Sequence, residues 1–301
     1  MLRGQTLVVS QAEAGRRLDR FLRERFPEAP ARSVRFALES GVVLVDGAVS
    51  AKGMALRAGE RVLVGALAER RDWLPVPSDL PGAAVAFADD HVAVLCKPHD
   101  VHTEPQRPNE EGTLAGFLRR LYPAVEEISP VPGLTLLTRL DYATSGAVPA
   151  ALTADSFSFL RHEREAGNLR KTYLCLVEGE VRSKTTIAFA VEAEGGETVR
   201  VHTGRNDPDP RRWTVVEPVR VAGGRTLARA TISRGKRHQI RAHLAALGHP
   251  IVGDRKYAAV PPAGPGKNRL MLHSEEVAFR HPATGEPLTV TCPAPPEFRL
   301  S

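Results

Sequence analysis

The sequence predicts an α+β protein, in which a small α/β unit precedes a large mixed, mainly antiparallel sheet with flanking helices. Two basic helical patterns and several short strand patterns share the first 65 residues. From Ala84 onward strand-like runs outnumber helical ones, and no strand-helix unit repeats as it would in a doubly wound parallel sheet. At 301 residues the chain is long enough for two domains.

The first 65 residues are expected to form a domain of two helices and a small sheet. Apolar residues recur at helical spacing across residues 15–26, and a second helix is expected at 33–39 with Ser33 as its cap. The apolar run VVLVDGAV at 42–49 contains an Asp-Gly turn, which predicts a strand and hairpin. GERVLV at 59–64 predicts a further strand.

Arginines cover both helices of this first domain. A basic helix face is often only a solvated surface, but here two helices carry the same sign and the whole chain has a net charge of +6. A polyanionic partner is therefore favoured, and these side chains would contact phosphates without reading sequence. The candidate residues are Arg16, Arg17, Arg20, Arg32 and Arg35.

A linker and a larger second domain are expected to follow. Residues 66–84 contain three prolines and show little periodicity, which is typical of a linker, and residues 85–301 form the second domain. Strand-like runs lie at 85–87, 92–97, 172–179, 186–195 and 227–235, and helices are expected near 112–121, 153–166 and 236–247.

The cysteines and the hydropathy pattern indicate a cytoplasmic protein. Cys96, Cys175 and Cys292 stand far apart in apolar surroundings, so we expect three small buried hydrophobic residues in a reducing compartment. No apolar run approaches the roughly 18 residues of a membrane span, and the N-terminal stretch becomes polar before a signal-peptide core could form. The sequence shows no coiled-coil repeat that would indicate a partner chain, so a monomer is expected.

One acid is placed unusually in the stretch LTRLDYATSG at 137–146. We expect the apolar residues before Asp141 to form a strand that holds it and the Thr-Ser-Gly turn after it to expose it. Serine hydrolase chemistry is poorly supported, because Ser145 has no GxSxG elbow around it. Paired carboxylates, as glycoside hydrolysis requires, are also missing around Asp141.

The segment SRGKRHQIRAHLAALGHP at 233–250 contains the most strongly patterned helix. Ile240, Leu244 and Leu247 define its buried face, and Gly248 is expected to end it. In a helix over 236–247, Arg237 and Arg241 would lie one turn apart and point at one place. A basic pair on the first turns of a helix suits a phosphate or a carboxylate, whereas the plainer alternative is solvated charge.

A metal site is not expected in this helix. His238 and His243 are five residues apart, which sets them roughly 140° apart around the helix axis, so they cannot share one ion. No further cysteine, histidine or carboxylate stands at ligand spacing, and no glycine-rich phosphate loop is present.

Two resemblances connect these segments. GRRLDRFL at 15–22 and GVVLVDG at 41–47 resemble the two hallmarks of an S4-type RNA-binding domain. Five ordered blocks of the remaining chain are similar to the RluA-type RNA pseudouridine synthases. The blocks are CKP at 96–98, TRLDYATSG at 138–146, KTYLCLVEG at 171–179, GKRHQIRAHLAALGHPIVGDRKY at 235–257 and RLMLHSEEVAFRHPATGE at 269–286.

The resemblance implies the pseudouridine synthase fold, a reaction for which no cofactor is expected, and a role for each matching residue. Asp141 matches the catalytic aspartate, which acts as nucleophile at ribose C1′ or as base on the ribose. Arg241 matches its ion-pair partner, and a close arginine favours the charged form of an aspartate. Tyr173 matches the tyrosine that stacks near the target base and assists proton loss from C5. The candidate substrate-binding residues are Arg139, which matches an RNA contact near the flipped nucleotide, Leu272 in the base pocket, His238 and Arg237.

Three departures from the family pattern bear on substrate choice and rate. Thr138 replaces the histidine that usually opens this motif, Cys96 stands where asparagine is common, and Pro149 interrupts an apolar strand, where we expect an edge or a bulge. The main alternative function is a catalytically inactive RNA-binding or RNA-chaperone protein that keeps the fold. Ribosomal RNA is the favoured substrate, and transfer RNA stays open.

Overall fold

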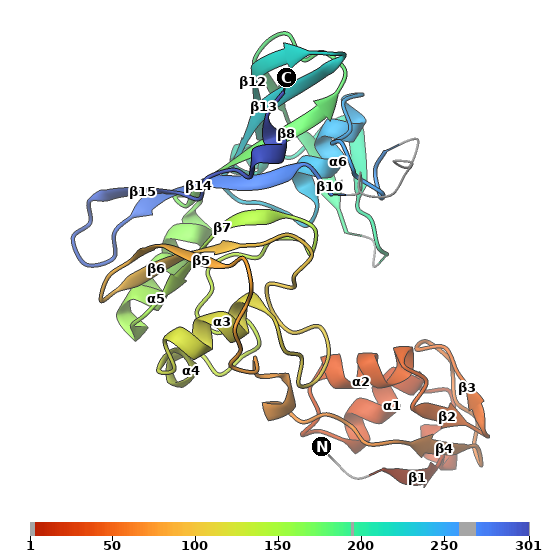
Figure 1. Cartoon of the computed structure of the whole chain (residues 1–301). Helices are drawn as coiled ribbons and strands as arrows, with labels where there is room; N and C mark the ends of the chain where they lie inside the picture. The colour runs from red at the N-terminus through yellow and green to blue at the C-terminus, as the bar shows by residue number, and fades with distance from the viewer. Residues whose placement is uncertain (1–3, 194–195, 259–268, 301) are drawn as a thin grey trace. The chain divides into compact units, whose positions relative to one another are not determined.

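The chain forms two compact units in a computed structural model, which describes residues 4–193, 196–258 and 269–300 (Figure 1). Unit 1 reaches Val76 and includes Pro105–Glu111 and Pro130–Pro132, and unit 2 contains the rest. The sequence places residues 66–84 in a linker, whereas the structure divides the chain between Val76 and Pro77.

Unit 1 consists of two helices and a small antiparallel sheet. Its elements are β1 (Gln5–Val8), η1 (Gln11–Glu13), α1 (Leu18–Arg25), α2 (Ala31–Glu39), β2 (Val43–Val45), β3 (Ala48–Val49), β4 (Arg61–Val64) and η2 (Arg71–Trp73), with strand order β1-β4-β2-β3. Leu18, Phe21 and Leu22 are fully buried on one face of α1, as the helical spacing predicts. The apolar stripes of both helices thus meet one face of the sheet, while their arginines stay outside.

Trp73 explains why unit 1 extends beyond residue 65. Its side chain is buried, and its indole Nε1–H donates a hydrogen bond of 2.7 Å to the Ser33 hydroxyl of α2. The Phe36 ring meets it edge to face. Ser33 therefore serves as a buried acceptor inside α2 rather than as the helix cap, which is Pro30.

Unit 2 is dominated by one large sheet with strand order β5-β6-β7-β14-β8-β13-β12-β9, and β15 pairs with β14 (Figure 1). Every pairing in it is antiparallel except that of β7 with β14. This mixed, mainly antiparallel sheet with flanking helices confirms the predicted fold class. Its strands are β5 (Ala84–Ala88), β6 (Val92–Lys97), β7 (Ser145–Ala151), β8 (Arg170–Glu178), β9 (Thr185–Ile187), β12 (Thr214–Ala222), β13 (Arg225–Ile232), β14 (Leu272–Arg280) and β15 (Pro287–Thr291).

Short helices and a separate ribbon complete unit 2. They are α3 (Leu114–Leu121), α4 (Val125–Ile128), α5 (Ala154–Ala166), α6 (Gln239–Ala246), η3 (Pro210–Arg212), η4 (Pro296–Phe298) and the β10 (Phe189–Glu192) and β11 (Arg200–Asn206) pair. Thr113 and Thr153 are the N-caps of α3 and α5, and their side chains accept hydrogen bonds from the first turn of each helix. Both helices therefore begin close to their predicted starts. The strand predicted at 186–195 divides into β9 and β10, and residues 194–195 lie outside the described residues.

The expectation that Pro149 lies at an edge or a bulge is wrong. β7 is fully buried between β6 and β14, and its register with β6 is regular. The carbonyl of Pro149 accepts a hydrogen bond of 2.8 Å from Leu137 N–H. Because the N and C=O of one strand residue face the same side, the missing N–H faces this irregular 135–137 segment. The proline therefore costs no bond of the regular ladder with β6.

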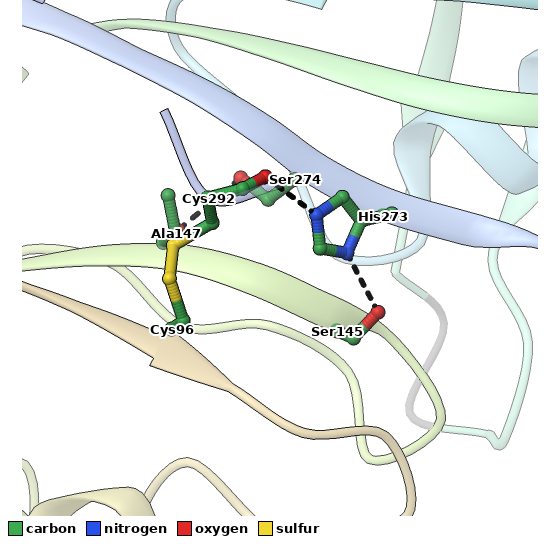
Figure 2. The surroundings of a disulfide bond; sticks show 6 residues. All are labelled: Cys96, Ser145, Ala147, His273, Ser274 and Cys292. Atoms are coloured by element: carbon green, nitrogen blue, oxygen red, sulfur yellow. Dashed lines mark hydrogen bonds between the residues drawn. A yellow bond between two sulfur atoms is a disulfide. The ribbon is translucent and has the colours of Figure 1, made fainter. Parts of the chain in front are cut away.

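The expectation of three unpaired cysteines is also wrong. Cys96 at the end of β6 and Cys292 after β15 form a disulfide across 196 residues of sequence (Figure 2). Cys175 remains a buried thiol, as expected, and burial raises its pKa to about 12. Nothing in the sequence spacing links the first pair, because the fold alone brings the two strand ends together.

Among the described residues, no helix is long and apolar enough to cross a membrane.

Candidate active site

Asp141 lies in a loop, and the strand comes after it rather than before it. The residues that lead to Asp141 are not a strand, whereas β7 begins at Ser145. The expected strand before the acid is therefore wrong, and the turn after it is confirmed by a hydrogen bond of 3.0 Å from Thr144 N–H to the Asp141 carbonyl. The Asp141 side chain is 27% exposed, so it remains open to a substrate while its backbone is fixed.

Two side chains hold the backbone on either side of Asp141. The Thr103 hydroxyl donates to Leu140 C=O at 2.8 Å and accepts from Leu140 N–H at 3.1 Å. On the other side, Lys97 Nζ donates to Tyr142 C=O at 3.2 Å. The acid is therefore clamped by contacts to both neighbouring residues, which replaces the rigidity that a strand would have given.

Lys97 is an almost fully buried cation at the end of β6. Its Nζ donates to the carbonyls of Pro98 and Val101, at 2.8 and 2.7 Å, in addition to that of Tyr142. Burial lowers the pKa of Lys97 to about 7, while the carboxylates of Asp141 and Asp100 oppose that shift. Three donated hydrogen bonds require the ammonium form, so the carbonyl cradle favours the charged state beside Asp141.

Arg241 on α6 joins Asp141 to a second, fully buried carboxylate. Its Nη1 donates to Asp141 Oδ2 at 2.8 Å, and its Nε and Nη2 donate to the two oxygens of Asp254 at 2.8 and 2.9 Å. Burial would raise the pKa of Asp254, but the hydrogen bonds and charge of Arg241 lower it overall. Burial likewise opposes the charged form of Arg241, whose pKa is nevertheless raised by Asp254 and Asp141. The bidentate pair fixes the guanidinium plane, and thereby the direction from which it meets Asp141.

The start of α6 differs from its prediction and separates the two expected arginines. The helix begins at Gln239, and His238 before it adopts a left-handed conformation with φ 53°. Arg237 consequently does not share a face with Arg241. It is exposed, and its Nη2 donates to the Glu197 carbonyl at 2.7 Å. The expectation that both arginines point at one place is wrong, because a helical spacing cannot be applied across a residue that is not helical.

His238 and Tyr257 form the wall of the site next to Asp141. His238 Nε2 lies 3.7 Å from Asp141 Oδ2, and its Nδ1 lies 2.9 Å from the Tyr257 hydroxyl. The Arg241 guanidinium carbon lies 5.3 Å from the centre of the Tyr257 ring. Burial lowers the pKa of His238 although the Asp141 carboxylate opposes this, so the imidazole is neutral at neutral pH.

Tyr173 and Leu272 are buried on adjacent strands. Tyr173 of β8 pairs with Ser274 of β14, and Cys175 pairs with Leu272. Alternate residues of paired strands share a face, so Tyr173 and Leu272 lie on the same side of the sheet. Burial raises the pKa of Tyr173, and the nearby Asp141 carboxylate raises it further. The phenol therefore keeps its proton.

Other residues singled out in the sequence make different contacts. Arg139 is exposed and pairs with Glu104. His243 is fully buried and hydrogen-bonds the Thr214 hydroxyl and the Phe189 carbonyl, both at 2.9 Å, so it belongs to the core. Among the described residues, no three histidine, cysteine or acidic side chains gather as metal ligands would. Thr138 is buried, and its hydroxyl has no hydrogen-bond partner within that part of the chain.

The candidate arginines of unit 1 are mostly exposed, and most of them form ion pairs with acidic side chains. Arg17 pairs with Asp19, and Arg16 and Arg20 both pair with Glu24. Arg35 lies 4.0 Å from Glu39, and the Arg32 guanidinium stacks over the Trp73 ring at 4.6 Å. Exposed ion pairs of this kind contribute little to stability and separate easily, so the arginines stay accessible to a stronger anion.

Four residues that hold the site were not singled out from the sequence. They are Lys97, Thr103, Asp254 and Tyr257. Lys97, Asp254 and Tyr257 lie inside the quoted blocks CKP and GDRKY, so their motifs pointed to the site although their contacts did not. Thr103 lies outside every block, and only the fold brings it to Leu140.

Comparisons with known proteins agree with this fold and show the family of the chain. A family model described as RNA pseudouridylate synthase matches residues 91–246. Ribosomal large subunit pseudouridine synthase D of Xanthomonas campestris pv. campestris is 31% identical, over 97% of this chain and 89% of its own length. Ribosomal large subunit pseudouridine synthase C of Escherichia coli strain K12 is also 31% identical, over 95% and 92%.

A solved structure, human RNA pseudouridylate synthase domain containing 1, shares the fold with a TM-score of 0.58 at 24% identity, over 74% of this chain and 89% of that one. The family model includes the segments that carry Asp141 and Arg241, and the match to the Xanthomonas protein extends along almost the whole chain. The chain therefore belongs to the RNA pseudouridylate synthase family, within the RluA-type enzymes that isomerise uridine to pseudouridine in RNA.

Proposed function

We propose that this protein isomerises uridines of large-subunit ribosomal RNA and that Asp141 is its catalytic residue. The single observation that carries the role of Asp141 is its pairing with Arg241, which is itself anchored on the buried Asp254. This arrangement fixes the direction of one carboxylate and leaves it partly exposed. The relatives named for large ribosomal subunit support the choice of RNA.

The reaction breaks the bond from ribose C1′ to uracil N1, turns the base, and joins C1′ to uracil C5. The uracil leaves with the bonding electron pair, and the hydrogen on C5 is lost as a proton after the new bond forms. Asp141 acts at the sugar, as nucleophile at C1′ or as base on the ribose. The ion pair with Arg241 holds the carboxylate in a fixed orientation, so it needs little reorganisation when the substrate arrives.

Tyr173 and Leu272 would pack against the flipped base. The raised pKa of Tyr173 makes its phenolate a costly base, which favours stacking over proton removal for this residue. Arg139 and Arg237 are exposed, so they would meet the RNA around the flipped nucleotide. Unpairing the target costs a few kcal/mol, which these contacts and phosphate contacts would offset.

The first unit would bind the RNA backbone as an S4-like domain, through Arg16, Arg17, Arg20, Arg32 and Arg35. A ribosomal substrate also implies that the enzyme acts in the cytoplasm, and we expect it to act as a monomer. Transfer RNA is the second candidate substrate, and inactive RNA binding is the alternative function.

Tritium release from RNA labelled at uracil C5 tests the proposal, because only replacement of the C5 hydrogen frees the label. We expect release from a large-subunit ribosomal transcript and none from transfer RNA. The Asp141→Asn variant should release no label, whereas the Asp90→Asn variant, at an exposed bend, should match the unaltered enzyme. Release equal to that of Asp141→Asn across all cellular RNAs would favour the inactive alternative, and release only from transfer RNA would reassign the substrate.

A further inference from the structure

The hydroxyl of Tyr257 lies within hydrogen-bond distance of His238 and bears on which imidazole nitrogen carries the proton. Val199 N–H donates to this hydroxyl oxygen at 2.9 Å. The hydroxyl has one proton to give, and its other hydrogen-bond neighbour among the described residues is His238 Nδ1, at 2.9 Å. Burial raises the pKa of Tyr257, so the phenol keeps that proton. Nδ1 of His238 therefore accepts, and a neutral imidazole must carry its own hydrogen on Nε2.

The Nε2–H group faces the reacting carboxylate but makes no hydrogen bond with the described residues. Its distance of 3.7 Å to Asp141 Oδ2 is too long for one. The same Oδ2 already accepts from Arg241 Nη1 at 2.8 Å. Within the described part of the chain, Asp141 Oδ1 accepts no hydrogen bond. The site thus presents one open acceptor oxygen and one unused donor side by side.

The unusual backbone conformation of His238 places its ring beside Asp141 and Tyr257. Its φ of 53° and ψ of 16° lie in the left-handed region, at the position that caps α6. This conformation is unfavourable for a residue with a side chain and persists where the surrounding structure enforces it. Here it turns the ring away from the helix and onto Asp141 and Tyr257, with the two rings edge to face.

We propose that His238 is a catalytic residue whose Nε2–H donates a hydrogen bond to the O2 oxygen of the target uracil, and that Tyr257 is the positioning residue that fixes this tautomer. The inference rests on the proposed function of Asp141. If Asp141 acts at the sugar, the bond from C1′ to N1 lies beside it. Of the base atoms next to that bond, only O2 can accept a hydrogen bond.

The chemical benefit lies in the departure of the base. When the C1′–N1 bond breaks, the electron pair stays on uracil and is shared among N1, O2 and O4. A fixed donor at O2 stabilises this developing charge without transferring a proton, and the base is still free to turn afterwards. The neutral imidazole is suited to this, because Arg241, Arg237 and Lys256 already provide positive charge around His238, which the Asp141 carboxylate opposes.

Replacing the target uridine by 2-thiouridine tests the proposed hydrogen bond to O2. The sulfur of 2-thiouridine at the target position accepts hydrogen bonds poorly, and its intrinsic effect on bond breaking cancels when enzyme variants are compared. We expect His238→Asn, which tolerates the left-handed backbone but is too short to reach, to lower the single-turnover rate on uridine about 100-fold. On 2-thiouridine the loss should be about tenfold or less, with substrate affinity unchanged on both.

Controls and a second readout keep the outcomes distinct. The exposed His162→Asn variant should keep the full rate on both substrates. Equal losses for His238→Asn on uridine and 2-thiouridine would overturn the proposal, as would a coupling seen with target 2′-deoxyuridine instead. An enzyme that releases no label from any RNA would refute the proposed function, whereas a normal rate in His238→Asn would refute this inference alone.

Nitrogen-15 NMR of the imidazole tests the role of Tyr257 without RNA. In the intact protein, we expect a protonated Nε2 and an unprotonated Nδ1, with the signal assigned through His238→Asn. Tyr257→Phe keeps the ring beside Arg241 but removes the hydroxyl, so the tautomers should mix and the single-turnover rate should fall about tenfold. Tyr122→Phe should change neither, and a proton found on Nδ1 in the unaltered protein would contradict the proposal.

Discussion

At the scale of single residues, the site depends on one guanidinium shared by two carboxylates. Asp254 is fully buried and takes two of the hydrogen bonds of Arg241, while the more exposed Asp141 takes one. The buried acid also accepts from the backbone N–H groups of Lys256 and Tyr257. Asp254 therefore serves as the anchor, and Asp141 is left with one oxygen for chemistry.

Removing the anchor charge should destabilise the fold and disable the site together. We expect Asp254→Asn to lower the free energy of unfolding by about 3 kcal/mol, because breaking a buried ion pair costs about 3 to 5 kcal/mol and Asp141 still compensates Arg241 in part. Urea unfolding at pH 7 measures this. Asp90→Asn, at an exposed position, should leave the urea midpoint in place, and a midpoint for Asp254→Asn equal to it would contradict the anchoring role.

The same pair predicts a pH dependence. The pKa of Asp254 is lower in the folded chain than its unfolded value of about 3.9. Its stabilising contribution is therefore complete above that pH and is lost as the pH falls through the folded pKa. The gap in unfolding free energy between the unaltered protein and Asp254→Asn should be constant from pH 7 to about 5 and shrink below about 4. A gap that widens in acid would show the opposite linkage.

Sequence motifs pointed to Asp141 and Arg241 but not to the residues that support them. Asp141 and Arg241 could be named because a resemblance assigns them roles, and their hydrogen bond confirms that they meet. The hydrogen bonds from Thr103 and Lys97 connect residues 37 and 45 positions apart, so no local pattern could reveal them. Arg237 was misplaced because a single left-handed residue ended the helical register.

At the scale of elements, most helices and strands could be predicted because their apolar spacing is regular. The predicted helix at 153–166 matches α5 closely, since Thr153 caps one end and Gly167 in the left-handed region ends the other. The strand β7 was harder to predict, because a proline and small residues weaken its pattern while its burial comes entirely from neighbouring strands.

The disulfide is the main feature at this scale that sequence could not reveal. Around it, His273 Nε2 donates to the Cys292 carbonyl and Ser145 donates to His273 Nδ1, at 2.9 and 2.8 Å (Figure 2). Ser145 is the first residue of β7, directly after the Asp141 turn. The bond and these contacts together connect β6, β7 and β14 at the ends nearest the site.

Reduction should therefore weaken the sheet. A disulfide contributes about 2 to 4 kcal/mol, so a reductant should lower the melting temperature by about 5 °C. The double variant Cys96→Ala/Cys292→Ala should melt at the lower temperature with or without reductant, which is the matched control. An equal response of that variant to reductant would contradict a role for the bond.

Thiol titration checks the pairing directly. The folded, oxidised protein should expose no reactive thiol, because Cys175 is buried and its pKa is raised to about 12. Unfolding should release one thiol, and unfolding with reduction should release all three of the cysteines in the chain. Three thiols on unfolding alone would mean that the protein keeps Cys96 and Cys292 reduced.

At the scale of the whole molecule, the net charge of +6 predicts binding to a polyanion, and composition could go no further. The division into two units was visible from the change in pattern, but its position was not. A proline-rich stretch looks like a linker whether or not a residue such as Trp73 anchors it, and that anchoring is a tertiary contact.

RNA affinity should depend on the exposed arginines of unit 1. Arg17, Arg20 and Arg35 have side chains that are 60%, 76% and 57% exposed. Replacing all three by alanine should reduce the slope of log affinity against log salt by about 2 to 3, because each phosphate contact contributes about 0.7 to 0.9. Filter binding of a ribosomal transcript across salt concentrations measures this.

The matched control replaces three exposed arginines of unit 2. Arg161, Arg182 and Arg225 are 55%, 84% and 46% exposed and carry the same total charge. Their removal should leave the slope unchanged. An equal drop in both triple variants would mean that net charge, rather than the face of unit 1, binds the RNA.

The bond between Cys96 and Cys292 also changes the topology of the chain. It closes residues 96–292 into a covalent ring, and every residue assigned to catalysis or base binding lies on that ring. A single backbone cut within it, for example at the exposed Arg182, would open the ring without releasing a fragment. In the oxidised protein, such a cut would leave the catalytic residues on one covalently connected molecule. In the reduced protein, the same cut would leave two separate chains.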